Sequence, residues 1–300
     1  MSYKTPRAFE QAINTHARRA ASQNGLKTGD LVTGYYFHRL VARVFHADPH
    51  GWLLKGGQAL LVRYAAQARL SRDIDLQRLG AEDPEAALET LCAAAATDLG
   101  DYLCYEPTKR QMLAELTGGA KQTFDVLIGV RRVASVSIDI VTGQTPTQNP
   151  VETALEPLME LEWPQDWPTV RLYPLADHIA DKVCAMYTRF QGRASSRIRD
   201  LPDLLLICQK DEVEGPAARA ALDSERERRR SLGHDLDLPD RFVLPDSSWE
   251  KLFPKAAANI SGLKGCATLD EARPLADAFL TPLLAGPLEA VWMPSDRAWR

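Results

Sequence analysis

WLLKGGQALLVRYAAQARLSRDIDLQRL, residues 52–79, is the stretch of the chain that decides the fold. It predicts a short apolar strand, a turn at Gly56-Gly57, and then an apolar segment with the spacing of a helix. A second strand follows, with Asp73 and Asp75 two residues apart. Because side chains alternate along a strand, we expect both carboxylates on one face and Ile74 and Leu76 on the other, towards a core.

This spacing has a chemical consequence. Two carboxylates held side by side repel each other strongly unless a cation lies between them. Carboxylate oxygens suit Mg²⁺, which in such sites also binds phosphates of the substrate. The glycines let the backbone approach a ligand closely, and the free N–H groups at the start of the next helix favour a phosphate. The stretch therefore predicts a site for a nucleoside triphosphate (NTP) and its metal, with Lys55, Gly56, Gly57 and Ser71 beside the nucleotide.

Each of these features alone also has a structural interpretation. A Gly-Gly pair before a helix is common, and alternating aspartates can form a solvated strand face. Ser71 lies just before the aspartates and is either a contact to phosphate, a control point, or a serine of the turn. As a control point, it would act through an added phosphoryl group, whose negative charge opposes NTP binding. The combination of features, in this order, favours the functional interpretation.

KGGQAL (residues 55–60) followed by RLSRDIDL (69–76) resembles the signature of the AbiEii/AbiGii-type nucleotidyltransferase toxins. That family includes the MenT toxins and belongs to the DNA polymerase β-like nucleotidyltransferase superfamily. The resemblance implies a third carboxylate on a later strand, and Asp139 in the alternating segment ASVSIDIV (134–141) stands in that place. An exposed residue on an edge strand is the alternative for Asp139. The resemblance thus implies Asp73, Asp75 and Asp139 as ligands of two Mg²⁺ ions.

Two later segments resemble the remaining motifs of the family. YPLADHIADKVCAMYTRF (173–190) predicts a helix that carries Lys182, which matches the motif lysine. RASSRIRDLPDLLLIC (193–208) predicts a helix that begins at Asp200 as its N-cap, and Asp203 matches the motif aspartate. The resemblance implies that Lys182 neutralises triphosphate charge as pyrophosphate leaves. Asp203 either orients Lys182 or acts as a base near the acceptor.

The sequence departs from the family pattern at three positions without losing a charged group: Gln58, Asp181 and Pro202. Arginines flank the motif residues at Arg189, Arg193, Arg197 and Arg199. Phosphate contacts of this kind give affinity for an anionic partner without sequence choice. The run DSERERRRS (223–231) is a second candidate for RNA contact, although a solvated helix face is the better interpretation.

The resemblance implies a toxin that transfers NMP to an RNA acceptor, the tRNA 3′ end, and so blocks translation, with a cognate antitoxin as partner. Two alternatives stay open. A small-molecule nucleotidyltransferase of the antibiotic-resistance type would need an acidic pocket for a cationic substrate. A catalytically idle nucleotide-binding protein would use the same residues without chemistry.

The expected fold class is α+β. Periodicity predicts helices over residues 6–22 and 30–47, a further helix from Asp83-Pro84 to about residue 99, and strands over 102–105, 121–133 and 134–141. Residues 109–116 stay open between helix and strand. We expect a polymerase β-like nucleotidyltransferase domain over 1–172, a mixed sheet flanked by helices, and a helical domain over 173–300. Residues 142–167, rich in Pro, Gln and Thr, are expected to connect them.

Composition is consistent with this assignment. Of the 300 residues, 45% are hydrophobic and 25% are charged, as in ordinary globular proteins. No apolar run approaches the ~20 residues that span a membrane, and the N-terminus does not have the pattern of a secretory signal. The five cysteines are scattered and lack metal-ligand spacing, so they are expected to be reduced thiols. We therefore expect a cytoplasmic protein without a membrane partner.

Overall fold

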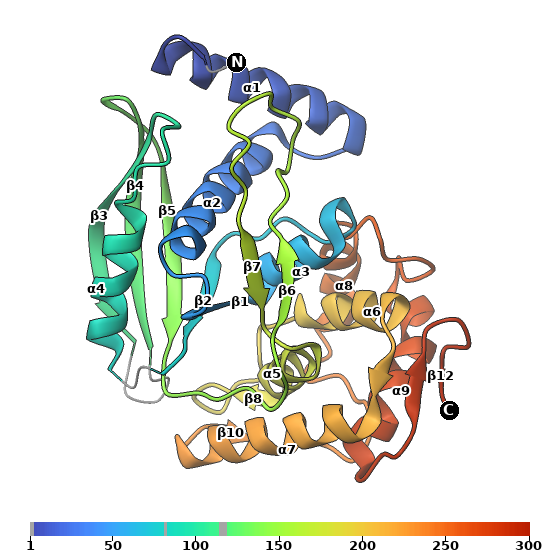
Figure 1. Ribbon diagram of the computed structural model, residues 1–300. Helices are drawn as coiled ribbons and strands as arrows, with labels where there is room; N and C mark the ends of the chain where they lie inside the picture. Colours follow the sequence, from blue (N-terminus) through green and yellow to red (C-terminus); the bar gives the residue numbers. More distant parts are fainter. Residues whose placement is uncertain (1–2, 81–82, 114–118) are drawn as a thin grey trace. The chain divides into compact units, whose positions relative to one another are not determined.

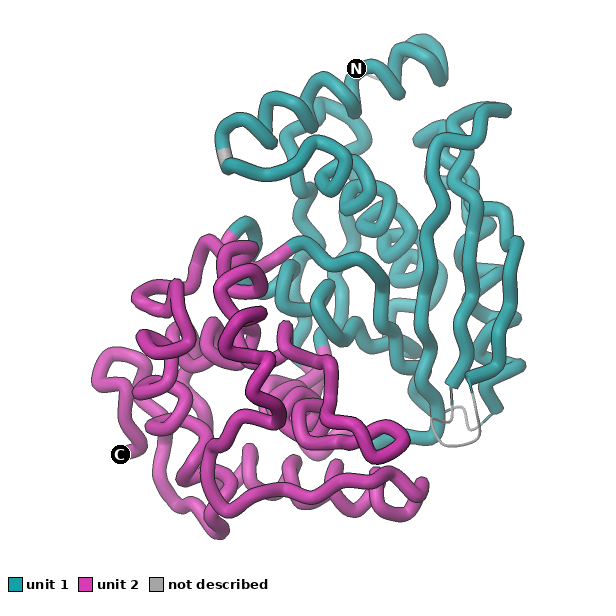
Figure 2. The backbone as a smooth tube through the Cα atoms, turned by 180° about the vertical axis from the view of Figure 1, so that it is seen from behind, with its two compact units in different colours: residues 1–66, 70–145, 151–172 teal, residues 67–69, 146–150, 173–300 magenta. Residues whose placement is uncertain are grey.

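The computed structural model describes residues 3–80, 83–113 and 119–300. The chain divides into two compact units (Figure 2). Unit 1 comprises residues 1–66, 70–145 and 151–172, and unit 2 comprises residues 67–69, 146–150 and 173–300. No helix in the described ranges is long and apolar enough to cross a membrane.

Unit 1 is built on a seven-stranded mixed sheet with the strand order β3-β4-β5-β2-β1-β7-β6 (Figure 1). The pairs β1–β7 and β2–β5 are parallel, and the other pairs are antiparallel. The expected α+β fold, a mixed sheet flanked by helices, is confirmed. In chain order the elements are α1 (Pro6–Asn24), α2 (Thr28–Ala47), β1 (Trp52–Lys55), α3 (Gly56–Tyr64), β2 (Ile74–Arg78), α4 (Pro84–Ala95), β3 (Leu103–Met112), β4 (Gly119–Ile128), β5 (Arg131–Val141), β6 (Val151–Ala154) and β7 (Thr169–Leu172).

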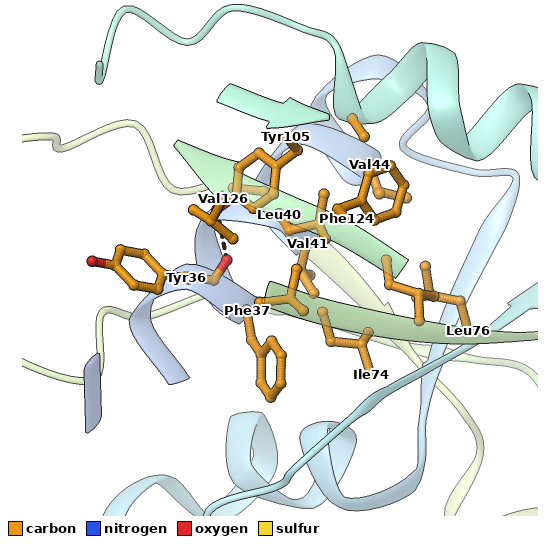
Figure 3. Packing of buried hydrophobic residues seen from close by; sticks show 14 of the residues in the cluster. Tyr36, Phe37, Leu40, Val41, Val44, Ile74, Leu76, Tyr105, Phe124 and Val126 are labelled. Atoms are coloured by element: carbon orange, nitrogen blue, oxygen red, sulfur yellow. Dashed lines mark hydrogen bonds between the residues drawn. The ribbon is translucent and has the colours of Figure 1, made fainter. Parts of the chain in front are cut away.

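The core of unit 1 lies where α2 packs against one face of the sheet (Figure 3). Leu40 and Val44 of α2 meet Ile74 and Leu76 of β2 and Phe124 of β4, and all five side chains are fully or almost fully buried. Burial of such a side chain is worth about 1.5–3 kcal/mol. Because side chains alternate along each strand, the residues between these apolar positions lie on the opposite face of the sheet.

The hairpin between β4 and β5 turns four residues earlier than the sequence predicted. β4 ends at Ile128 and β5 begins at Arg131, so the expected boundary between residues 133 and 134 was wrong. Gly129 has φ +61, a conformation that tight turns require and that glycine adopts readily. The alternating pattern on both sides hid this turn, because the pattern continues through it.

The segments predicted separately at 102–105 and 109–116 belong to one strand. β3 runs from Leu103 to Met112 along β4, with a break in register between Pro107 and Arg110. Such a break interrupts the alternation from which strands are recognised in sequence. Residues 114–116 lie outside the described residues.

The segment 142–167 is not simply a connection, which corrects the expectation from its composition. Residues 151–172 belong to unit 1, where β6 pairs with β7 at the edge of the sheet. Leu155 and Met159 are buried in the core of the unit. Their irregular spacing explains why the sequence pattern missed them, since neither strand nor helix periodicity is present.

Unit 2 is mainly helical. Its elements are α5 (Leu175–Tyr187), β8 (Thr188–Arg189), α6 (Asp200–Lys210), β9 (Val213–Glu214), α7 (Gly215–Ser231), β10 (Asp235–Leu236), α8 (Trp249–Ala257), α9 (Leu269–Ala285), β11 (Val291–Met293) and β12 (Ala298–Trp299). The short strands form two small sheets, β10-β8 and β12-β11-β9. Both sheets are additions to the predicted helical domain.

Candidate functional site

A row of charged residues crosses four neighbouring strands of the unit 1 sheet. In the strand register, Lys55 of β1 is paired with Asp75 of β2, Asp75 with Asp139 of β5, and Asp139 with Lys121 of β4. Directly paired residues project to the same face of a sheet, which is here the face opposite α2. Two carboxylates thus lie at the centre of the row and one ammonium group lies at each end.

Asp73 lies immediately before β2 and is held by its own turn. The Ser71 hydroxyl donates to the backbone oxygen of Asp73 at 2.9 Å and to its Oδ1 at 3.2 Å. Ser71 is only 8% exposed. The structure therefore gives Ser71 a positioning contact with one of the predicted ligands.

Lys121 is a functional candidate that the sequence reasoning missed. Its Nζ lies 2.9 Å from Asp139 Oδ1 and donates to Oδ2 at 3.2 Å. Partial burial alone would lower the pKa of Lys121. The hydrogen bond and charge of Asp139, together with the charges of Asp73 and Asp75, instead raise it above the ordinary value. The carboxylates of Asp73, Asp75 and Asp139 therefore all lie close enough to Lys121 to stabilise its charge. Only the correct position of the β4–β5 turn brings Lys121 into register with Asp139, so no local signal identified it.

The turn that enters α3 approaches the central carboxylate at Gly56. This residue has φ +59, and a Cβ atom placed on it would overlap the Asp75 carboxylate. Lys55 occupies the N-cap position of α3, and its side chain makes no cap hydrogen bond to the first N–H groups of the helix. Lys55 itself is buried and donates from Nζ to Gln144 Oε1 at 3.3 Å.

The donor types in this unit fit a divalent metal. Carboxylate oxygens are the hard ligands that Mg²⁺ prefers, and the lack of a side chain at Gly56 lets the backbone approach the Asp75 carboxylate closely. Among residues 3–80, 83–113 and 119–300, however, no three Asp, Glu, His or Cys side chains are already gathered at ligand distance. Asp139 is paired with Lys121 instead, so its use as a ligand requires this ion pair to rearrange.

A second charged cluster lies in unit 2 around Lys182 of α5. Lys182 is 2% exposed, and its Nζ donates to Asp200 Oδ1 at 2.9 Å and to Asp203 Oδ2 at 2.7 Å. Arg197 donates to the other oxygen of Asp200 at 2.8 Å. Arg69 holds Asp203 through two hydrogen bonds of 3.1 and 3.0 Å. The predicted lysine and aspartate are thus brought together, with three cations around two carboxylates.

The role expected for Asp200 was wrong. Arg199 occupies the N-cap position of α6, and Asp200 is the first helical residue. Its carboxylate binds Lys182 and Arg197 instead of the helix N–H groups. Burial alone would raise the pKa of Asp200, but the charges of these two partners lower it. Likewise, burial would lower the pKa of Lys182, and the carboxylates of Asp200 and Asp203 raise it. Asp200 and Lys182 are therefore both kept ionised.

Arginines of the run at residues 223–231 on α7 form ion pairs with acidic residues of unit 2. Arg228 and Arg229 both pair with Glu225, and Arg229 also binds Asp181 at 2.9 Å. Arg229 is itself buried. The run is therefore not simply a solvated helix face, since Glu225 and Arg229 are buried, and the ion pairs of Arg228 and Arg229 lie within unit 2. Exposed arginines lie instead in the segment between α5 and α6, at Arg189, Arg193, Arg197 and Arg199.

A mixed sheet, a glycine turn into a helix, and Asp73 and Asp75 at the start of β2 are the features expected of a nucleotidyltransferase. The family model described as "Nucleotidyl transferase AbiEii toxin, Type IV TA system" matches residues 39–273. The chain belongs to this family of toxin–antitoxin nucleotidyltransferases. Membership implies an NTP as substrate, usually with a divalent metal, and an antitoxin as partner.

The solved structure of MenT4 agrees with the fold. The chain is similar to MenT4, a nucleotidyltransferase toxin from Mycobacterium tuberculosis, with 16% identity and a TM-score of 0.53 over 90% of this chain and 98% of that one. It is also similar to a putative nucleotidyltransferase from H. pylori, with 14% identity and a TM-score of 0.46 over 85% and 94% of the two chains. No curated protein matches the chain.

Proposed function

We propose that this toxin transfers NMP from an NTP to a hydroxyl group of an RNA acceptor, the tRNA 3′ end, and thereby blocks translation. The observation that carries the proposal is the row Lys55–Asp75–Asp139–Lys121 beside the turn at Gly56. In the reaction, the acceptor oxygen forms a bond to the α-phosphorus and the bond between the α- and β-phosphates breaks. Pyrophosphate leaves with the bonding electrons, and the hydroxyl proton passes to solvent.

The residues of unit 1 receive the following roles in this proposal. Asp73, Asp75 and Asp139 would hold Mg²⁺, in a two-metal site, and Ser71 keeps Asp73 in place. When bound, Mg²⁺ would neutralise triphosphate charge and make the acceptor hydroxyl more acidic. The backbone N–H groups at Gly56 and Gly57 would bind phosphate oxygens, with Lys55 as a nearby positive charge.

The residues of unit 2 receive supporting roles. Lys182 would stabilise the negative charge that develops on the leaving pyrophosphate. Both oxygens of Asp203 accept hydrogen bonds, and the residue is 1% exposed. These contacts favour a positioning role, in which Asp203 orients Lys182, over a role as base near the acceptor.

The alternatives explain less of the structure. A small-molecule transferase for cationic substrates needs an acidic acceptor pocket, whereas the exposed segment between α5 and α6 carries four arginines and no acidic residue. An idle nucleotide-binding protein has no need of the third carboxylate and its lysine. We also propose a cytoplasmic location, because the reaction uses NTP and tRNA.

Incubation with total tRNA, Mg²⁺ and each α-labelled NTP in turn tests the proposal. We expect one NTP to label RNA and Asp75→Asn to reduce the labelling rate by about 10²–10³-fold, the usual effect of losing one charge-stabilising group. Asp125→Asn is the matched control, because Asp125 lies on the same sheet outside the row and pairs with Arg132. Failure of all four NTPs to label RNA would overturn the RNA acceptor. Full activity of Asp75→Asn would overturn the site.

A further inference from the structure

The segment between α5 and α6 forms a small projecting hairpin. The N–H of Phe190 donates to the backbone oxygen of Arg193 at 2.9 Å, and the N–H of Arg193 donates back to Phe190 at 3.0 Å. The two residues between them, Gln191 and Gly192, have φ +52 and +74. Positive φ at both central positions is the feature of a type I′ turn. Gln191 adopts this conformation although it has a side chain, so the local shape is maintained against its usual preference.

Both ends of this hairpin are fixed to the body of unit 2. The Thr188 hydroxyl donates to the backbone oxygen of Cys184 at 2.7 Å, and the Ser195 hydroxyl donates to that of Ala185 at 2.8 Å. Trp249 Nε1 donates to the backbone oxygen of Ser195 at 3.2 Å. Thr188, Ser195 and Trp249 are all buried. The tip therefore projects from a well-anchored base.

The tip presents an apolar ring and positive charge together. Phe190 is 56% exposed, and because it is directly paired with Arg193 the two side chains project to the same face. Residues 188–199 hold four arginines and no acidic residue. Asp235 of β10 is paired in register with Arg189. Within the described part of the chain, no carboxylate lies within 4 Å of the Arg193 guanidinium group.

The hairpin is linked directly to the Lys182 cluster. Arg197, which belongs to the same exposed segment, donates to Asp200 at 2.8 Å, and Asp200 in turn accepts from Lys182 at 2.9 Å. The exposed segment is therefore connected through Arg197 and Asp200 to Lys182, the residue of unit 2 that we assign to the triphosphate.

We propose that Phe190 and Arg193 form a platform for the single-stranded end of the RNA acceptor, with a base stacked on the Phe190 ring and phosphates held by Arg193 and Arg189. The inference rests on the proposed function, since it names the subsite that receives the acceptor. Aromatic stacking beside a basic track is how proteins bind single strands without sequence choice, and the bases of a duplex are not open to it. One aromatic ring among arginines is too little apolar surface for the core of a stable protein interface.

Binding of RNA without catalysis tests this inference separately from the reaction. The probes are a fluorescein-labelled 12-nucleotide single-stranded RNA and a duplex of the same sequence, titrated by anisotropy in EDTA without NTP. We expect Phe190→Ala to weaken binding of the single strand by about 5- to 100-fold and to leave duplex binding unchanged. Phe190→Trp should restore affinity, because the indole ring also stacks. Arg193→Gln should reduce the salt dependence of binding by about one phosphate contact.

Leu252→Ala is the matched control, because Leu252 is an apolar residue of unit 2 with similar exposure, 48%. Wild-type binding by Phe190→Ala, in a protein that still labels RNA, would overturn the platform and leave the proposed function intact. A wild-type protein that neither binds nor labels RNA would overturn both. Equal losses for the single strand and the duplex would show that Phe190 does not stack on a base, and would also overturn the platform.

Discussion

The two charged clusters of this protein both combine basic side chains with aspartates. They differ in how much of the side-chain surface is exposed to solvent. In unit 1, Lys121 and Asp139 keep 34% and 26% of their side-chain surface exposed. In unit 2, Lys182 and Asp203 keep only 3% and 1%. With Asp73 included, the first cluster holds three carboxylates and two ammonium groups, whereas the second holds two carboxylates and three cations.

This difference in exposure indicates in which cluster an ion pair can be replaced by a bound metal at low free-energy cost. An ion pair near the surface is worth roughly 0–1 kcal/mol, so a bound metal can replace Lys121 at Asp139 at little cost. A buried pair that loses one member leaves a charge without compensation, and that costs about 3–5 kcal/mol. We therefore regard the unit 1 cluster as adaptable and the unit 2 cluster as a fixed arrangement.

Gly56→Ala in the adaptable cluster is expected to have a large effect on activity. The added Cβ would overlap the Asp75 carboxylate and displace it, and misplacement by about 1 Å typically reduces rates by about 10²-fold. Labelling of RNA under single-turnover conditions measures the loss. Gly100→Ala is the control, since Gly100 has a similar φ of +68 and no atom within 4 Å of the new Cβ. Equal losses in both variants would mean that backbone strain alone is responsible.

The next effect is on stability, from Lys182→Met in the fixed cluster. The variant leaves Asp200 and Asp203 buried with one arginine each, so we expect a loss of about 3–5 kcal/mol in the free energy of unfolding. Denaturant titration followed by circular dichroism measures it. A loss below about 1 kcal/mol would contradict the view that this cluster is fixed.

The fixed cluster should also respond to pH in a defined direction. The pKa of Asp200 is lowered in the folded state. Its contribution to the free energy of unfolding is therefore present above the ordinary aspartate pKa and is lost as the pH falls through the lowered value. The pKa of Lys182 is raised in the folded state. Its contribution to the free energy of unfolding is therefore complete below the ordinary lysine pKa and is lost as the pH rises through the raised value. Melting temperatures of Asp200→Asn should therefore fall less steeply in acid than those of the wild type.

The smallest expected effect is on stability, from Lys121→Met in the adaptable cluster. Removal of this partly exposed lysine should change the free energy of unfolding by less than about 1 kcal/mol. Because Lys121 no longer competes for Asp139, added Mg²⁺ should raise the melting temperature of the variant more than that of the wild type. Lys121→Arg keeps the ion pair and should behave like the wild type. A smaller response of Lys121→Met to Mg²⁺ would show that the lysine supports metal binding.

The elements of the site that local rules govern could be predicted. The glycine turn, the strand with Asp75, the helix of Lys182 and the α+β class all follow from periodicity and turn chemistry over a few residues. The end of β4 could not be placed, since its alternation continues past Gly129. The edge strand β6 could not be found either, because its short segment has no distinctive period.

The sequence by itself determined which residue types stand on which face of each element, because backbone geometry fixes the directions of neighbouring side chains. Only the tertiary structure decided their partners. Lys121 and Asp139 are 18 residues apart and meet through the register of β4 and β5, which one turn sets. Arg69 and Asp203 are 134 residues apart and meet only when unit 2 is folded. Contacts of this kind depend on how whole segments pack, and no local pattern encodes them.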